Sequence, residues 1–124
     1  MLNYQNFKIQ NYGKIMEKNQ NIRVVFVTTN HFENAKMIAR NILSEQLAAC
    51  CSIIPNVTSF FWWDDQLNEE NEHILLIKTN EEKLNELENR IQQLHEYDVP
   101  EIIVIDVSNV STSYLDWLNG ILKL

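Results

Sequence analysis

Four large aromatic side chains follow one another at Phe60–Trp63, within the stretch S-F-F-W-W-D-D. A β-strand points successive side chains to opposite faces, so a strand with one wet face alternates apolar and polar residues. Here Phe60 and Trp62 share one face while Phe61 and Trp63 share the other. Burying one such side chain is worth about 1.5–3 kcal/mol. Both faces of this strand therefore need apolar surroundings.

The rest of the chain alternates between the two periodicities of strands and helices. Apolar stripes at helical spacing follow the sequences Asn30-x-x-Glu33 and Thr79-x-x-Glu82, which resemble capping boxes, and Ser111 is expected to cap a last short helix. Strands are predicted over residues 22–28, 50–63 with an interruption at Pro55-Asn56, 72–78 after a turn at Asp64-Asp65, and 102–107. The last of these, I-I-V-I-D-V, is nearly all apolar, which favours a central strand covered on both faces.

The predicted order is β-α-β-β-α-β with a terminal helix. That order is typical of the ferredoxin-like α+β sandwich, in which right-handed crossovers place both main helices on the same face of the sheet. The other face is left bare. Because the aromatic run also needs cover, we expect other copies of the chain to supply it, and we infer a homo-oligomer.

The charge of the chain argues against some classes of binding partner. The chain has 124 residues and a formal net charge of −7, with 10 basic and 17 acidic residues. No Lys/Arg stripe is visible, so binding to nucleic acid or to an anionic membrane surface is not expected. No apolar run is long enough to cross a bilayer. Residues 1–21, which contain no signal-peptide core and no Arg-rich targeting pattern, are predicted to be a flexible extension before one domain at 22–124.

The cysteines, Cys50 and Cys51, are adjacent in the chain. Neighbouring residues of a strand point to opposite faces, so the two do not form a disulfide framework. Reduced thiols indicate a reducing compartment, and we expect the protein in the cytoplasm.

Short motifs in a fixed order suggest a family. They are L-A-A-C (47–50), S-x-x-x-W (59–63), K-T (78–79), H-x-Y-D-V-P-E (95–101) and Y-L-x-W-L (114–118). Together they resemble the CutA family of divalent-cation-tolerance proteins, over about residues 23–118. The resemblance implies a ferredoxin-like homotrimer without catalytic activity, in which long hairpins extend between neighbours. It also implies binding of copper or another divalent metal ion and a role in metal homeostasis and the response to metal ions, with no organic cofactor. Animal members are linked instead to anchoring acetylcholinesterase in neuronal membranes.

Four parts of the sequence depart from the family's pattern. Cys51 stands where the family tends to have a small aliphatic residue. The first strand ends F-V-T-T, without the Cys that family members use for copper, so a soft thiolate ligand is missing. Glu96 replaces the usual Pro after His95. Asp64-Asp65-Gln66 replaces the usual E-G-K, which weakens the case for an anion site at that turn.

The resemblance assigns candidate site residues. His95 is the candidate metal ligand, and a His⁺ at the negative end of a helix dipole is the alternative. Trp63, Lys78, Tyr97 and Trp117 are expected to line a cleft between subunits, with plain packing as the alternative for Trp117. His31 and His73 are expected to be solvated.

Three classes of function remain open. The first is a trimeric, non-catalytic protein that binds copper or other divalent ions. The second is a trimer that binds a small molecule in signalling, resembling PII-type regulators, or a scaffold that anchors another protein. The third is a Cys/His hydrolase, which ranks last because the sequence has no nucleophile elbow or Cys-His signature.

Overall fold

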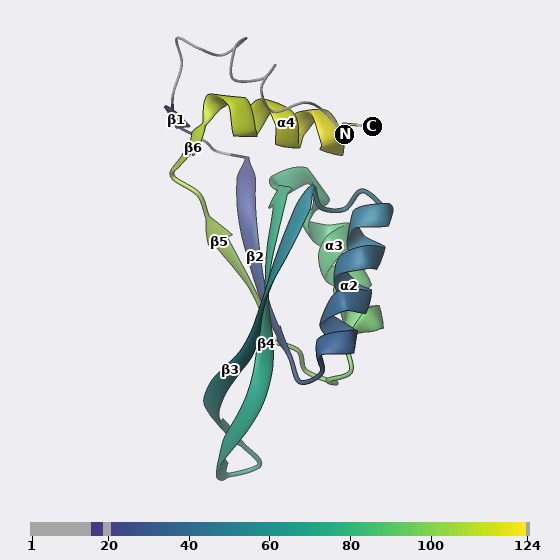
Figure 1. The fold of residues 1–124 in the computed structure, drawn as a ribbon, viewed down its shortest axis with the longest axis vertical. Coiled ribbons are helices and arrows are strands. Elements are labelled where there is room, and N and C mark those ends of the chain that lie inside the picture. The colour runs from purple at the N-terminus through teal and green to yellow at the C-terminus, as the bar shows by residue number, and fades with distance from the viewer. Residues whose placement is uncertain (1–15, 19–20, 124) are drawn as a thin grey trace.

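A computed structural model describes residues 16–18 and 21–123 of the chain, and its centre is an antiparallel sheet with the strand order β3-β4-β2-β5 (Figure 1). The elements of the main layer are β2 (Ile22–Thr29), α2 (Phe32–Ser44), β3 (Cys50–Trp63), β4 (Gln66–Asn80), η1 (Glu81–Lys83), α3 (Leu84–Leu94) and β5 (Ile102–Asp106). This is the predicted ferredoxin-like α+β arrangement. The chain then adds β6 (Asn109–Ser111) and α4 (Thr112–Leu122).

Helices α2 and α3 pack on the same face of the sheet (Figure 1). The strands pair Val25 with Ile77 and Val27 with Leu75, so these four side chains share one face of the sheet. They pack against the helices in the same buried cluster. The apolar stripes of both helices meet them in one fully buried core, to which the helices contribute Ala35, Ile38, Ala39, Ile42, Leu87 and Ile91. The helical spacing in the sequence therefore predicted the covered face correctly.

The strand β5 lies at an edge of the sheet, paired only with β2 among the described residues. The prediction of a central strand covered on both faces is therefore wrong for the single chain. Ile103 and Ile105 lie beside Phe26 and Val24 on the open face and are 50% and 45% exposed. An apolar run indicates that a strand needs to be buried, but it does not indicate whether the same chain or another copy buries it.

Strands β3 and β4 form a long hairpin that extends beyond the helical layer (Figure 1). The interruption predicted at Pro55-Asn56 is a break in register between Ile54 and Val57 within one strand, and Asn56 has a φ of 57°. Asp64 and Asp65 form the two-residue turn, with φ values of 56° and 59°. Positive φ at both central positions matches the twist of a hairpin, and Asp tolerates it better than most residues.

A second apolar cluster lies between α4 and the end of the sheet away from the hairpin tip (Figure 1). Ile22, Trp117, Leu118 and Leu122 are its buried members. Cys50 packs against this cluster, whereas Cys51 packs against the helical core. The adjacent thiols thus point to opposite faces, as predicted, and both are free.

Part of the predicted extension is paired with the C-terminal region. Met16–Lys18 form β1, which is antiparallel to β6 with Glu17 opposite Val110. The remaining residues of the predicted flexible segment, except Asn21, lie outside the described residues, so that prediction stays a prediction.

Both helix starts differ from the predicted capping boxes. His31, not Asn30, is the N-cap of α2, and it makes no side-chain capping bond. The side-chain oxygen of Asn30 is buried and has no hydrogen-bond partner among the described residues. At the second start Asn80, not Thr79, accepts the Lys83 backbone N–H. The Thr79 hydroxyl instead donates to the Leu47 carbonyl. Ser111 is the N-cap of α4 as predicted, but its side chain makes no capping bond.

Candidate functional site

A hollow of about 740 Å³ lies where the hairpin meets the loop that follows α3. Strands β3 and β4 supply one wall, and residues 96–101 with the end of β2 supply the other. The lining residues are Thr28, Asn30, Ser59, Phe60, Phe61, Trp63, Asn68, Glu70, Glu72, Glu96, Tyr97, Asp98, Val99 and Glu101.

The hollow combines negative charge with aromatic rings. Five of its lining residues are Asp or Glu, and no Lys, Arg or His of the described residues lines it. Thr28 donates to one of these carboxylates, Glu101, over 3.4 Å. Carboxylates held between low-dielectric walls concentrate cations from solution. The hollow is thus suited to a positively charged ligand.

Tyr97 connects the loop to the hairpin through Glu72. The phenol donates a hydrogen bond to Oε2 of Glu72 over 2.8 Å, and Glu72 is only 4% exposed. Burial of the phenol, followed by its hydrogen bond to the Glu72 carboxylate, raises the pKa of Tyr97 far above its usual value. Tyr97 therefore stays a neutral donor throughout the physiological range.

His95 is buried beneath the loop with both ring nitrogens engaged by backbone groups. The Tyr97 backbone N–H donates to Nδ1 over 2.9 Å, and Nε2 lies 2.7 Å from the Thr28 carbonyl oxygen. These partners fit the neutral ring with its proton on Nε2, donating to Thr28. In this conformation neither nitrogen offers a free lone pair to a metal ion, and the ring holds the loop in place.

His31 and Glu96 form an exposed pair at the rim of the hollow. Nδ1 of His31 lies 3.0 Å from Oε2 of Glu96, which is also a lining residue. Imidazole and carboxylate are both ligands of divalent first-row metals. Within residues 16–18 and 21–123, however, no three His, Cys, Asp or Glu side chains are grouped as a metal site.

Comparison with known proteins identifies the family. Residues 23–120 match the model of the CutA1 divalent ion tolerance protein family. The chain belongs to the CutA1 family. The resemblance inferred from the five motifs is therefore confirmed, and CutA1 is a non-catalytic family of divalent-cation tolerance.

Curated relatives and solved structures agree with this assignment. The chain is 41% identical over 97 residues to "Protein CutA 1, chloroplastic" of Oryza sativa, covering 78% of this chain and 55% of the rice protein. It is 39% identical over 95 residues to the CutA protein of Thermus thermophilus, covering 77% of this chain and 92% of that protein. The structure of CutA from Synechococcus elongatus superimposes with a TM-score of 0.83 at 30% identity, covering 86% of this chain and 95% of that one. The chain thus spans about half the length of the plant relatives and nearly the whole Thermus protein.

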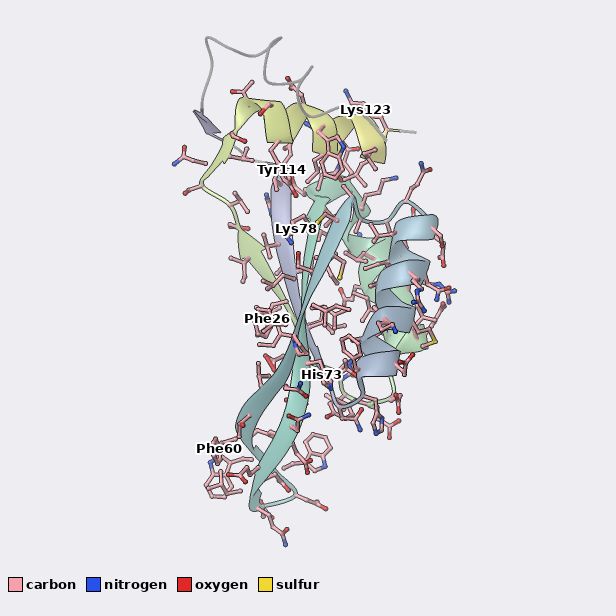
Figure 2. The ribbon with its side chains drawn as sticks, viewed as in Figure 1. Phe26, Phe60, His73, Lys78, Tyr114 and Lys123 are labelled. Atoms are coloured by element: carbon pink, nitrogen blue, oxygen red, sulfur yellow. The ribbon has the colours of Figure 1, made fainter. Side chains whose placement is uncertain are left out.

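The CutA1 fold separates the predicted cleft residues into two groups. Trp63 and Tyr97 line the same hollow. Lys78 lies six residues along β4 from Glu72, about 20 Å at the rise of a strand, and Figure 2 shows it well above Phe60 of the hairpin. Its ammonium group donates to Ser52 Oγ over 2.8 Å. Trp117 is buried in the cluster beneath α4 beside Tyr114.

Two features of the site were missed or misjudged from the sequence. His73 was expected to be solvated, but it is buried and accepts the Asn56 backbone N–H on Nδ1 over 3.1 Å (Figure 2). It thereby fastens β4 to the irregularity in β3. Glu72 begins the strand predicted at 72–78 and was not named as a site residue, although its spacing of two from Ile74 and four from Leu76 already placed it on their face of the strand.

Cys51 is not suited to nucleophilic chemistry. Burial raises the pKa of the Cys51 thiol to about 11, and the nearby Lys78 only partly offsets this. A thiol with a raised pKa is a poor nucleophile at neutral pH because little thiolate is present.

The described part of the chain contains no helix that is both long and apolar enough to span a membrane.

Proposed function

We propose that this CutA1 protein is a non-catalytic homotrimer that binds copper or another divalent cation as part of metal homeostasis. The observation that carries the proposal is the pair of His31 and Glu96, two metal-ligating side chains in contact at the rim of the acidic hollow. Family membership supplies the link to divalent-cation tolerance. The charge of −7 supports partners other than nucleic acid or anionic membranes.

Two histidines compete as the metal ligand. His95 is the candidate from the motif, but a metal ion would have to replace the bond to Tyr97 or the bond to Thr28. His31 is exposed and already lies beside the Glu96 carboxylate. We therefore favour the His31–Glu96 pair at the rim as the first point of metal contact.

Calorimetric titration with Cu(II) and Zn(II) tests this assignment. His31→Ala and Glu96→Gln are expected to weaken binding about tenfold each, the effect of losing one supporting ligand group. His95→Gln is expected to leave affinity within about threefold once the variant is shown to be folded. Glu33→Gln, an exposed acid outside the hollow, is the matched control. Equal binding by the wild type, His31→Ala and Glu96→Gln would contradict the rim site, and loss only in His95→Gln would restore His95 as the ligand.

Assembly as a homotrimer is supported by the apolar surface that the single chain leaves open. Trp62 is 73% exposed on the hairpin, and Ile103 and Ile105 are exposed on the edge strand β5. Large exposed apolar areas mark protein interfaces. Light scattering after size exclusion is expected to give three times the subunit mass of 14.7 kDa.

A variant pair tests which surface carries the assembly. Ile103→Lys places a charge on the open face and is expected to yield single subunits, whereas Met37→Lys on α2 is expected to leave the assembly intact. Both side chains are exposed in the single chain, so neither change removes core packing. A wild-type protein that stays a single subunit at micromolar concentration would overturn the proposal.

A small-molecule signalling trimer, resembling PII-type regulators, is the second candidate, and the size of the hollow favours it over a purely anchoring scaffold. A thermal-shift panel of metabolites tests it, because any ligand of the folded state raises the melting temperature. We also propose the cytoplasm, since Cys50 and Cys51 are free. Names of relatives place homologues in the chloroplast and the periplasm, so cell fractionation is the deciding measurement.

A further inference from the structure

We propose that the hollow binds a small organic cation, a protonated or quaternary amine. This inference goes beyond the divalent-metal role and does not depend on it. Four aromatic residues, Phe60, Phe61, Trp63 and Tyr97, line the same hollow as the carboxylates. The faces of aromatic rings attract cations, and quaternary ammonium groups are recognised by such aromatic walls.

Glu72 gives the strongest sign that a cation belongs there. Its side chain lines the hollow and is nine-tenths buried. Its carboxylate accepts a hydrogen bond from the neutral phenol of Tyr97, and no Lys or Arg of the described residues forms an ion pair with it. A buried carboxylate is costly unless it is paired with positive charge. A cation entering the hollow would supply that charge.

Other ligand classes fit this cavity less well. An anion or nucleotide would meet carboxylates and no lining Lys or Arg among the described residues. A bare metal ion would need several oxygen or nitrogen ligands close together, and the described residues contain no such group. The volume lies within the range of small-molecule pockets, about 300–1,000 Å³. Aromatic walls would go unused by a hydrated metal ion but would contact the methyl or methylene groups of an amine.

Tetramethylammonium is a suitable probe, with the neutral and similarly shaped tert-butanol as its control. Isothermal titration of the assembled protein is expected to show saturable binding of tetramethylammonium and none of tert-butanol. Trp63→Leu is expected to weaken binding about threefold, the size of one cation–π contact at an exposed ring. Glu72→Gln is expected to weaken binding about tenfold, the size of one charge-assisted contact at a buried carboxylate. His31→Ala is expected to leave tetramethylammonium binding unchanged, which separates this site from the proposed metal site.

Neighbouring residues of the hairpin that do not line the hollow provide matched controls. Trp62→Leu and Glu69→Gln change the same residue types at positions that do not line the hollow. Once light scattering shows that these variants have the same mass in solution as the wild type, they are expected to keep wild-type affinity. Equal binding of tert-butanol, absence of saturable tetramethylammonium binding, or equal losses in the control and test variants would each overturn the proposal. If the assembled protein binds zinc but not tetramethylammonium, the organic-cation site is wrong while the metal role stands.

Discussion

The phenolic oxygen of Tyr97 lies 2.8 Å from Oε2 of the buried Glu72, and this hydrogen bond joins the loop after α3 to the β3–β4 hairpin. Tyr97→Phe removes the donor and leaves a buried carboxylate without it. Loss of one hydrogen bond to a buried charged group costs about 1–3 kcal/mol. We expect the free energy of unfolding to fall by that amount in guanidinium denaturation at one fixed protein concentration.

A double-mutant cycle isolates this contact. Glu72→Gln keeps the shape of the side chain and removes its charge. If the pair interacts as the distance indicates, the double variant is destabilised by less than the sum of the single variants. Strictly additive losses would show that the two side chains act independently.

The contact between Tyr97 and Glu72 predicts that the Tyr97 phenol loses its proton only at unusually high pH. Burial and the bond to Glu72 raise the pKa of Tyr97 above 10.0, the value of a free tyrosine. The unfolded chain therefore loses this proton at lower pH than the folded chain, so the stabilisation is complete below pH 10 and is lost as the pH rises further. Absorbance at tyrosinate wavelengths, compared with Tyr97→Phe, is expected to show one late-ionising group. Ionisation of that group at the free value would contradict the contact.

Cys51 is expected to resist alkylation in the folded protein. A thiol pKa near 11 instead of 9.0 lowers the thiolate fraction at pH 8 about a hundredfold. Greater nucleophilicity of a high-pKa thiolate offsets part of this, so labelling in Cys50→Ser is expected to be at least about tenfold slower than in urea. Equal rates in the two conditions would mean that Cys51 is accessible and ionised.

The hairpin turn offers a stabilising substitution. Asp64 and Asp65 both have positive φ, which costs any residue with a Cβ. Glycine at the second central position is preferred in turns of this kind. Asp65→Gly is expected to raise the free energy of unfolding by about 0.5–1 kcal/mol. Asp106→Gly, in a strand with extended backbone, serves as the opposite control and is expected to destabilise. A melting temperature that falls in Asp65→Gly would show that the aspartate side chain stabilises the turn.

Local patterns in the sequence predicted the elements and their covered faces. The spacing of Ile38, Ile42, Leu87 and Ile91 indicated helices on one face, and all four are buried there. The adjacency of Cys50 and Cys51 predicted opposite faces, as observed. Motif order indicated the family. The inferences about covered faces depend on periods of a few residues, which backbone geometry alone imposes.

The hollow and the states of the histidines depended on tertiary structure. His73 and His95 resemble exposed polar residues in the sequence, yet both are buried by contacts with distant segments. Nδ1 of His73 accepts the backbone N–H of Asn56, and Nε2 of His95 lies 2.7 Å from the carbonyl oxygen of Thr28. The two walls of the hollow are joined by the hydrogen bond from Tyr97 to Glu72, which precedes it by 25 residues. No local sequence pattern predicts this contact. The edge position of β5 likewise follows from strand order. Local periodicity thus identified the apolar side chains that need burial. The burial of Glu72, His73 and His95 followed only from the fold, because contacts between distant segments are set by the packing of the whole domain.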